Sequence, residues 1–406
     1  MNVEIRSCRD REEMAEYSRL LTYVFAGEQE VSDREVGVTQ PEWTTCAWVD
    51  GKLATTLGTI PFTVRLNGAP VSMGGVTAVG TLPQHRRNGL LRQVMRQALE
   101  TMRDRGQACA ILWASMGAIY QRFGYGLAAS QVGYSFDPRY AAFASPGAVS
   151  GSVELLSKED GFPVAKQLYI EYATPRNLML HRSTYLWDEH TLRPHKKGIP
   201  VHIAVYRDAS GTPRGYMVYS VTEDSFPEPG PNQVMRVKDF VVLDMDAYRG
   251  LWEYILRHDL MGRVRMPNAV PEDDPAPDLL LEPRMLNRTT MDAIWMRVVD
   301  VERALPGRPY GEPGELTFAI TGDDLCPWNN ATYLLETDGA TSTIRRTDRI
   351  PALTMPVNSL ASLLSGHRSA TRLSRAGLLE SADTTALRTA DGLFRTEYAP
   401  FCPNDF

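Results

Sequence analysis

Apolar residues that follow Gly89 recur at the spacing of one face of a helix. They are Leu90, Leu91, Val94, Met95, Ala98, Leu99 and Met102. Arginine, glutamine and glutamate are prominent at the positions between them, so the pattern predicts an amphipathic helix. Residues 76–82 predict a strand that ends at Pro83, because proline cannot donate a hydrogen bond to a sheet. The chain here is therefore expected to run strand, turn, helix.

Strand and helix patterns also alternate in the rest of the first 145 residues. Residues 5–25 predict a strand followed by a helix. Further strands are expected at residues 43–49, 53–60, 62–66 and 108–115. The pairs Asp50-Gly51 and Asn67-Gly68 are typical of tight hairpin turns. Residues 141–151 are rich in alanine, serine and glycine and predict a linker.

The middle of the chain repeats this plan. Strand patterns are expected at residues 201–206, 215–221 and 235–243, with a helix at residues 248–256. Residues 267–283 are rich in proline and aspartate and predict a loop or a domain boundary.

The last third combines strands that resemble an antiparallel meander with helices. The strands are expected at residues 314–320, 331–336 and 341–346, and the helices at residues 356–365 and 370–378. Together the patterns predict an α+β protein with three domains, at residues 1–145, 152–290 and 291–406.

Length, composition and charge narrow the class of protein. A chain of 406 residues is long enough for two or three domains, and 43% hydrophobic with 23% charged residues is ordinary for a globular protein. No stretch approaches the ~20 apolar residues of a membrane span. The first residues lack the apolar core of a signal peptide, so we expect a cytoplasmic protein that binds no membrane. The net charge of −6 argues against a nucleic-acid binder.

Cysteine and histidine usage predicts neither a disulfide framework nor a metal site. The five cysteines are scattered and odd in number, without a Cys-x-x-Cys pair, which is typical of reduced thiols. The seven histidines show no ligand spacing, and His181, His190 and His195 are expected at the surface.

The turn before the first amphipathic helix carries a candidate anion site. Arg86 and Arg87 place positive charge beside a helix N-terminus, where free backbone N–H groups already attract anions. Gly89 lets the main chain approach a bulky phosphate closely. An ordinary strand–turn–helix unit with surface arginines would show the same residues, so this segment alone leaves both interpretations open.

Two motifs resemble those of the GNAT acyltransferases. Residues 86–91, Arg-Arg-Asn-Gly-Leu-Leu, resemble motif A, Gln/Arg-x-x-Gly-x-Gly/Ala, with Leu91 where many members have a small residue. Residues 117–126 resemble a later motif, a tyrosine shortly before Gly-Phe or Gly-Tyr. The resemblance implies that loop amides and the helix N-terminus hold the pyrophosphate of acetyl-CoA, and that the preceding strand pairs with its pantetheine arm. The implied cofactor-binding residues are Val79, Gly80, Thr81, Arg86, Arg87, Asn88, Gly89, Leu90, Leu91, Arg92, Ser115 and Met116.

Four segments together resemble the Eis family ("enhanced intracellular survival" N-acetyltransferases) over essentially the whole chain. They are residues 83–91, 119–126 and 186–189 and the C-terminal phenylalanine. The resemblance implies two tandem GNAT folds, the second degenerate, then a domain similar to sterol carrier proteins, and assembly as a homohexamer. We expect the last domain to act as a scaffold rather than a lipid carrier, because a shared fold does not fix function.

The second region differs from the first at the turn before its helix. Asp244 and Asp246 stand where Arg86 and Arg87 stand in the first region. Acidic residues cap a helix N-terminus well but repel pyrophosphate. The second fold is therefore expected not to bind CoA, and an unrelated α/β domain is the alternative.

Acetyl transfer to an amine needs a group that takes a proton from the amine and one that protonates the departing thiolate. The resemblance implies Tyr120 as the proton donor, and a phenol with a pKa near ~10 stays protonated at pH 7. The alternative is that Tyr120 belongs to the core, since Ile119, Tyr120 and Phe123 share a helical spacing. Tyr125 is expected only to pack.

The resemblance implies that the C-terminal carboxylate, here that of Phe406, accepts the proton. No glutamate or histidine of the first region stands out as a base, and Trp113 occupies a position where the related pattern often has histidine. A carboxylate with a pKa near ~3.5 is a weak base, but desolvation raises such a pKa. Two prolines stiffen the ending, whereas a frayed tail is the usual state of a terminus.

The chain is thus expected to be an acetyl-CoA-dependent N-acetyltransferase for small polycationic amines, with aminoglycosides as the class that the resemblance implies. Candidate amine-binding residues are Glu28, Glu30, Trp43 and Asp405. One alternative is a protein or peptide lysine N-acetyltransferase. The other is an inactive lipid-binding or scaffold protein, and the intact motif residues Arg86, Arg87, Gly89, Tyr120 and Phe406 weigh against it.

Overall fold

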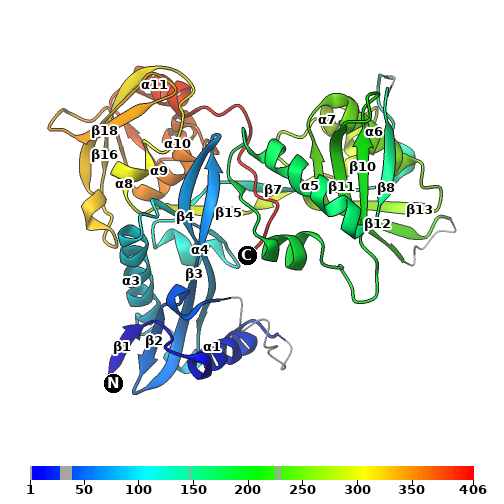
Figure 1. Ribbon diagram of the computed structural model, residues 1–406. Coiled ribbons are helices and arrows are strands. Elements are labelled where there is room, and N and C mark those ends of the chain that lie inside the picture. The colour runs from blue at the N-terminus through cyan, green and yellow to red at the C-terminus, as the bar shows by residue number, and fades with distance from the viewer. Residues whose placement is uncertain (1, 28–38, 146, 148, 225, 227–229) are drawn as a thin grey trace.

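The structure, a computed structural model, describes all residues except 1, 28–38, 146, 148, 225 and 227–229. Its named strands form three sheets. In Figure 1 the green second region and the yellow-to-red third region flank the blue-to-cyan first region. The red C-terminal segment runs between the second and third regions and ends at the first, where the ring of Phe406 lies close to Gly75.

The first sheet has the strand order β1-β2-β3-β4-β5-β15-β6, with β9 beside β3. Its strands are β1 (Val3–Arg6), β2 (Cys46–Val49), β3 (Lys52–Leu66), β4 (Ala69–Thr81), β5 (Cys109–Trp113), β6 (Gly126–Leu127), β9 (Met179–Leu180) and β15 (Ile294–Val298). The helices of this region are α1 (Arg11–Val24), α3 (Leu90–Asp104) and α4 (Gly117–Gln121). The predicted amphipathic helix is confirmed as α3, and every residue of its predicted apolar face except the half-buried Leu91 is buried.

One long strand replaces two predicted ones. β3 runs without a break from Lys52 to Leu66, whereas strands were expected at residues 53–60 and 62–66. Pro61 is tolerated inside it because, at this position, only β4 flanks β3 among the described strands. The predicted hairpin turns at Asp50 and Asn67 are confirmed, and both residues adopt the positive φ that such turns require, 48° and 50°.

The second sheet has the order β14-β7-β13-β12-β11-β10-β8. Its strands are β7 (Ser130–Phe136), β8 (Ser152–Leu156), β10 (His202–Arg207), β11 (Pro213–Glu223), β12 (Gln233–Val242), β13 (Met261–Val270) and β14 (Thr289–Asp292). Helices α5 (Lys158–Ala173), α6 (Met245–Leu256) and α7 (Ala276–Leu279) belong to this region. The expectation of a loop from Pro267 was wrong, since β13 continues to Val270. The ladder between β13 and β7 shifts register between Met266 and Val270, which accommodates the proline.

Two strands cross between the first and second sheets. β7 precedes the expected linker but pairs with β13 and β14 in the second sheet. β15 follows the second region but pairs with β5 and β6 in the first sheet. The boundaries expected at residues 1–145, 152–290 and 291–406 stay a prediction. The first sheet includes β9 and β15 from beyond residues 1–145, and the second includes β7 from before residue 152.

The third sheet has the order β18-β17-β16-β19-β20. Its strands are β16 (Gly314–Ile320), β17 (Ala331–Thr337), β18 (Ser342–Arg346), β19 (Leu353–Met355) and β20 (Glu380–Ser381). Helices α8 (Val301–Ala304), α9 (Val357–Leu364), α10 (Ala370–Arg375) and α11 (Thr384–Phe394) cover it. The predicted meander is confirmed, because β16, β17 and β18 pair antiparallel in sequence order.

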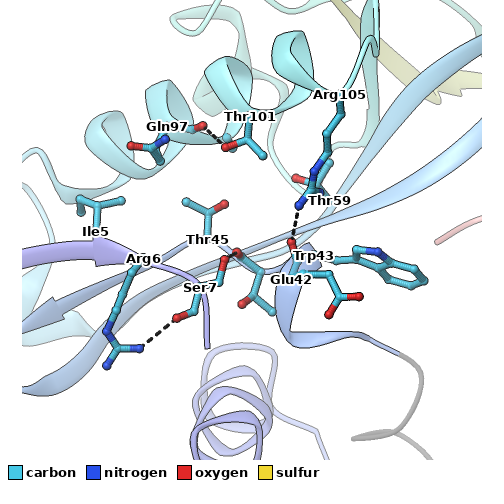
Figure 2. A pocket seen from close by; sticks show the side chains of 12 residues that line it. Ile5, Arg6, Ser7, Glu42, Trp43, Thr45, Thr59, Gln97, Thr101 and Arg105 are labelled. Atoms are coloured by element: carbon cyan, nitrogen blue, oxygen red, sulfur yellow. Dashed lines mark hydrogen bonds between the residues drawn. The ribbon is translucent and has the colours of Figure 1, made fainter. Parts of the chain in front are cut away.

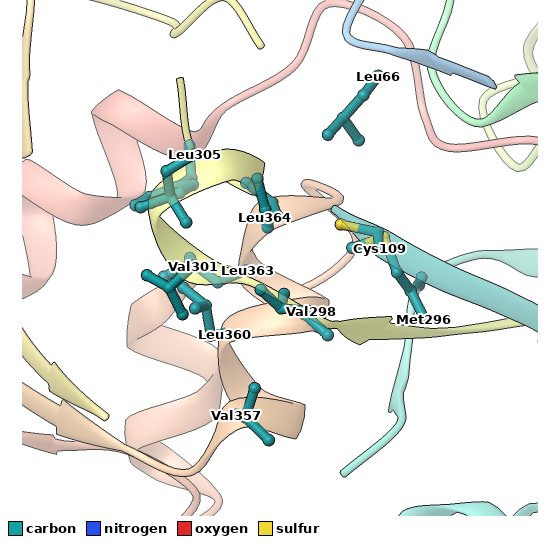
Figure 3. Close-up of a cluster of buried hydrophobic side chains, with 14 of the residues drawn as sticks. Leu66, Cys109, Met296, Val298, Val301, Leu305, Val357, Leu360, Leu363 and Leu364 are labelled. Carbon is teal, nitrogen blue, oxygen red and sulfur yellow. The ribbon is translucent and has the colours of Figure 1, made fainter. Parts of the chain in front are cut away.

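One apolar core joins the third region to the first sheet. Figure 3 shows Met296 and Val298 of β15 and Cys109 of β5 in the same buried cluster as Leu360 and Leu363 of α9. Each of these side chains is at most 1% exposed. Removal of this apolar surface from water, at roughly 25 cal/mol per Å², holds the two regions together.

Neither a membrane span nor a metal cluster is found in the part of the chain that the structure describes. No described helix has the length and apolar character needed to cross a bilayer. Among the described residues, no three His, Cys, Asp or Glu side chains are placed to hold a metal ion. All five cysteines are free thiols and buried.

Replacing the buried Leu360 by alanine should lower the free energy of unfolding by about 2–5 kcal/mol, because the lost transfer energy and the cavity left behind add. The measurement is chemical denaturation of the wild type and the variant. Ile350→Ala is the matched control, since Ile350 is 89% exposed and its loss should cost less than about 0.5 kcal/mol. Similar losses for both variants would contradict a core shared by the two regions.

Candidate active site

The first sheet opens into a fork between two parallel strands. β4 and β5 pair only from Met73 to Gly75, opposite Cys109 to Ile111, and then separate. A bulge helps to bend β4 away: Ala78 has a φ of 54°, and the register against β3 shifts at this point. Beyond Gly75, the edge of β4 that faces β5 has no strand partner among the described residues. Its free backbone groups can pair with an extended ligand.

The turn after β4 presents an uncapped helix N-terminus. The Nε of Arg86 donates to the Thr81 carbonyl at 3.0 Å, which ties the turn to the end of β4. Arg87 and Gly89 both have positive φ, 66° and 74°, and no side chain caps α3. A Cβ at Gly89 would meet nothing within 4 Å, so the space in front of the first-turn amides is open. These amides lack partners inside the helix and, with the two arginines, suit an anion.

The predicted cofactor residues line both arms of the fork and the turn between them. Val79, Gly80 and Thr81 end β4, while Ser115 and Met116 are exposed just beyond β5. Arg86, Arg87, Asn88, Gly89, Leu90 and Leu91 form the turn and the start of α3. Arg92 is exposed and its Nη2 lies 3.5 Å from Asp324, a weak surface pair. The arrangement fits a nucleotide-linked ligand with its phosphates at α3 and its arm along β4.

Tyr120 lies on α4, which follows the arm that β5 provides. Its side chain is 6% exposed, and burial raises the pKa of its phenol. The ring is edge-on to Tyr125 at 5.9 Å between centroids. Tyr125 is fully buried, and its hydroxyl donates to the sulfur of Met95 at 3.8 Å. Tyr125 is therefore a core residue, and Tyr120 packs in the same buried cluster as Phe123 and Tyr125, as the core alternative expects. The raised pKa keeps the phenol of Tyr120 protonated near neutral pH.

A cavity of about 860 Å³ lies beside the fork, between α1, β3, β4 and residues 181–193. Its described lining is largely aromatic and apolar and includes Tyr17, Trp43, Phe62, Tyr185, Leu186 and Phe406. Of the candidate amine-binding residues, Trp43 lines the cavity, and Glu28 and Glu30 lie outside the described residues. Asp405 instead pairs with His190, whose Nδ1 lies 3.0 Å from a carboxylate oxygen of Asp405. This hydrogen bond lowers the pKa of Asp405.

The last residue reaches the point where the fork opens. The ring of Phe406 packs edge-on against Phe62 at 4.9 Å between centroids. A Cβ added at Gly75, the last paired residue of β4, would lie 3.1 Å from the Phe406 ring. Glycine at this position therefore makes room for both rings. The alternative of a frayed tail does not hold, because the terminus is packed into the wall of the cavity.

Two side chains hold the tail just before Phe406. Trp113 donates from Nε1 to the Asn404 carbonyl at 2.8 Å, and Arg182 donates from Nε to the Asn404 side chain at 2.9 Å. Trp113, noted in the sequence only as a missing histidine, is thus an anchor. Sequence reasoning missed Arg182 and Asn404 altogether, since they are 222 positions apart and belong to no local motif.

A second, smaller pocket of about 260 Å³ lies under α3 (Figure 2). Several of its polar groups bond to the main chain: Arg6 to the Ser7 carbonyl at 2.9 Å and Arg105 to the Glu42 carbonyl at 2.8 Å. Trp43 is part of the wall of both the smaller pocket and the large cavity.

Family models match the chain in three consecutive stretches. A model described as an acetyltransferase (GNAT) domain matches residues 4–128, and another with the same description matches residues 178–298. A sterol carrier protein domain model matches residues 301–403. The three matches follow one another along the chain in the same order as the three sheets.

Relatives match over most or all of the chain. An uncharacterized N-acetyltransferase of Streptomyces avermitilis is 30% identical over 100% of this chain and 99% of its own length. The N-acetyltransferase Eis of Mycobacterium tuberculosis is 30% identical over 80% of this chain and 78% of its own. The crystal structure of Eis1 from Mycobacterium abscessus superposes with a TM-score of 0.86 at 28% identity, covering 100% of both chains. A GCN5-related N-acetyltransferase from Anabaena variabilis, 22% identical with a TM-score of 0.86 and 100% coverage of both chains, shares the fold.

Replacing Arg87 by alanine should weaken the binding of CoA by about tenfold or more, because one charge-assisted contact to phosphate is worth about 1.5 kcal/mol or more. Isothermal titration calorimetry at two salt concentrations measures the effect, which should shrink at high salt. Arg349→Ala, an exposed arginine of the third region, is the control and should bind CoA like the wild type. Unchanged affinity in Arg87→Ala would argue against an anion site at this turn.

Proposed function

The chain belongs to the Eis family of GNAT N-acetyltransferases, and we propose that it acetylates primary amines of small cationic substrates, with Tyr120 as the acid and the Phe406 carboxylate as the base. The observation that carries this proposal is the place of Phe406. The last residue of the chain lines the large cavity and also lies against Gly75, where β4 and β5 separate. An acyl donor along β4 and an amine in the cavity would meet beside the terminal carboxylate.

Acetyl-CoA is the acyl donor that GNAT enzymes use, and the residues present fit it. The open edge of β4 suits the pantetheine arm, and the uncapped start of α3 with Arg86 and Arg87 suits the pyrophosphate. Bound there, acetyl-CoA supplies an acetyl thioester.

In the proposed reaction, the Phe406 carboxylate takes a proton from the substrate ammonium, and the free amine attacks the thioester carbonyl carbon. The C–N bond forms, the C–S bond breaks, and Tyr120 gives its proton to the departing thiolate. The acylated nitrogen still carries an extra proton, and its transfer to the Tyr120 phenolate leaves the neutral amide and restores the phenol. Burial of Tyr120 supports this role, because a raised pKa keeps the phenol protonated until the thiolate appears. The aromatic side chains around Phe406 support the other role, since desolvation makes a carboxylate a stronger base.

The cavity supports a small-molecule substrate over a protein lysine. Its volume of about 860 Å³ lies in the range typical of drug-sized ligands, roughly 300–1,000 Å³, whereas one lysine side chain would fill little of it. We propose an aminoglycoside-like polyamine as the substrate class. None of the described lining residues is Asp or Glu, so the terminal carboxylate is the described anion that would meet its ammonium groups. A protein lysine acetyltransferase is the alternative.

A thiol-release assay with acetyl-CoA separates these classes. The panel is an aminoglycoside, spermidine, a lysine peptide and an aromatic monoamine. We expect kcat/KM to be highest for the aminoglycoside, because a multi-ring amine fills the cavity. A lysine peptide as the best substrate would favour the alternative. Tight CoA binding without turnover of any amine would indicate an inactive scaffold.

Deleting Phe406 should abolish acetylation while leaving the affinity for acetyl-CoA within about twofold. The deletion removes the proposed base but touches neither the turn nor α3. Turnover by thiol release and CoA binding by calorimetry measure the two effects. A tag added at the C-terminus should act like the deletion, since it displaces the carboxylate, whereas the same tag at the N-terminus should be harmless. Full activity after the deletion would remove Phe406 from the mechanism.

Tyr120→Phe should lower kcat by about 10²-fold or more, because the thiolate loses its proton donor. In the wild type, the rate should fall at high pH only above about pH 10, since burial raises the pKa of Tyr120 above its ordinary value. Tyr125→Phe is the control: it loses only the weak contact to Met95 and should keep both kcat and the pH profile. A kcat–pH profile of the three proteins provides the measurement, and equal losses in both variants would assign the effect to packing.

A further inference from the structure

The second GNAT region contains a fork like that of the first. β12 and β13 are parallel and pair from Gln233 to Arg236, opposite Met261 to Arg265, and then separate. The helix that follows β12, α6, begins beside this fork as α3 does beside the first. Here the carboxylate of Asp244 caps the helix by accepting from the Ala247 amide at 2.9 Å. The second fork therefore has the strand arrangement of the first, but it lacks the uncapped helix start and the arginines that suit an anion.

The C-terminal tail bonds to the β13 arm of this second fork and shares a buried cluster with the β12 arm. On the β13 side, Asn268 donates to the Cys402 carbonyl at 3.0 Å, and the Ala399 amide donates to Asp273 at 2.8 Å. On the β12 side, Phe401 is buried in the same cluster as Val241. Figure 1 shows the red tail passing along the green region before it ends. The tail thus lies where the first fork leaves room for the arm of an acyl donor.

A buried ion pair connects this fork to the tail. Arg182 and Asp239 of β12 form two hydrogen bonds, at 2.6 and 3.0 Å, with side chains only 2% and 3% exposed. Tyr216 donates to the same carboxylate at 2.5 Å. The third nitrogen of the Arg182 guanidinium, Nε, donates to the side-chain oxygen of Asn404 at 2.9 Å. All of the hydrogen-bonding nitrogens of Arg182 thereby point to Asp239, Tyr216 or the tail.

Asn404 is held from both GNAT regions at once. Its side chain accepts from Arg182, whereas its main-chain carbonyl accepts from Trp113 at the end of β5. It is 2% exposed and precedes Phe406 by two positions. A buried ion pair is a weak source of stability, because desolvating two charges offsets most of their attraction. What the ion pair provides instead is a fixed position for the Arg182 guanidinium, which donates to Asn404 of the tail.

We propose that the second fork is the binding site for the chain's own tail, and that Arg182, Asp239 and Asn404 are positioning residues that aim the Phe406 carboxylate. This inference rests on the proposed function, in which that carboxylate is the base. The second region then contributes to catalysis by positioning the base, in addition to lining the cavity with residues 181–193. A displacement of about 1 Å at a reacting group can cost roughly 100-fold in rate, so the hold on Asn404 matters for turnover.

Asn404→Ala tests the inference, because it removes the acceptor and leaves the pair between Arg182 and Asp239 intact. We expect kcat to fall by roughly 10- to 100-fold with an unchanged KM for acetyl-CoA. Asn404→Asp keeps an acceptor oxygen for Arg182 and should restore most of kcat. Carboxypeptidase should release Phe406 faster from Asn404→Ala than from the wild type, a readout that needs no turnover.

Arg182→Lys is the second variant, since lysine keeps the charge opposite Asp239 but not the planar fork that also reaches Asn404. It should lower kcat as Asn404→Ala does, and the two losses should not add, because both break one contact. Asp323→Asn is the matched control. Asp323 pairs with Arg297 at 2.5 Å, with 3% and 0% exposure, and its other side-chain partners, Cys326 and Asn329, lie outside the tail. That variant should lose stability and keep kcat.

Wild-type kcat and wild-type carboxypeptidase resistance in folded Asn404→Ala or Arg182→Lys would overturn the inference. So would an equal loss of kcat in Asp323→Asn, which would indicate a general effect of breaking a buried pair. The deletion of Phe406 separates the test of the proposed base from the test of the positioning residues. Full activity after the deletion refutes the proposed base itself, whereas an inactive deletion together with a fully active Asn404→Ala refutes only the positioning role.

Discussion

The double hold on Asn404 is the constraint on which the proposed site depends. One bond comes from Trp113 of the first sheet and the other from Arg182, whose charge is neutralised by Asp239 of the second sheet. Trp113 ends β5, and Arg182, which follows β9, is fixed by its pair with Asp239 of β12, so the tail is held relative to both sheets. A C-terminal carboxylate is ordinarily mobile and hydrated. Here the bonds to Asn404 and the packing of Phe406 on Phe62 fix the last residue, with its ring at the point where β4 and β5 separate.

The two forks show how one fold is put to two uses by a few residues. Both consist of parallel strands that pair briefly and separate, followed by a helix. In the first, the helix starts without a cap, behind two arginines, so its amides are free for an anion. In the second, Asp244 satisfies an amide and brings negative charge, and the tail contacts the strands. Capping chemistry at one turn thus separates the proposed donor site from the tail site.

The exchange of strands makes the frame around the tail rigid. β7 enters the second sheet and β15 the first, so neither sheet is complete without a strand from outside its own region. β15 also carries Met296 and Val298 into the core shared with α9. The third region, which ends in the tail, is therefore packed onto the same sheet that forms the donor fork. This packing gives the sterol-carrier-like domain a structural role of the kind expected for a scaffold.

The sequence by itself determined the local features: the amphipathic face of α3, the hairpin turns, the meander of the third region, the two motifs, the uncapped start of α3 and the Asp244 cap of α6. Each depends on residues within a few positions of one another, so the spacing of residues along the chain is enough to predict it. It erred where context decides, as at Pro61 and Pro267, which β3 and β13 tolerate because no regular ladder is broken there. Only the tertiary structure decided the exchange of β7 and β15, the cavity, and the meeting of Arg182, Asp239 and Asn404. These contacts join residues up to 222 positions apart, and no periodicity or motif encodes which distant groups become neighbours when sheets pack.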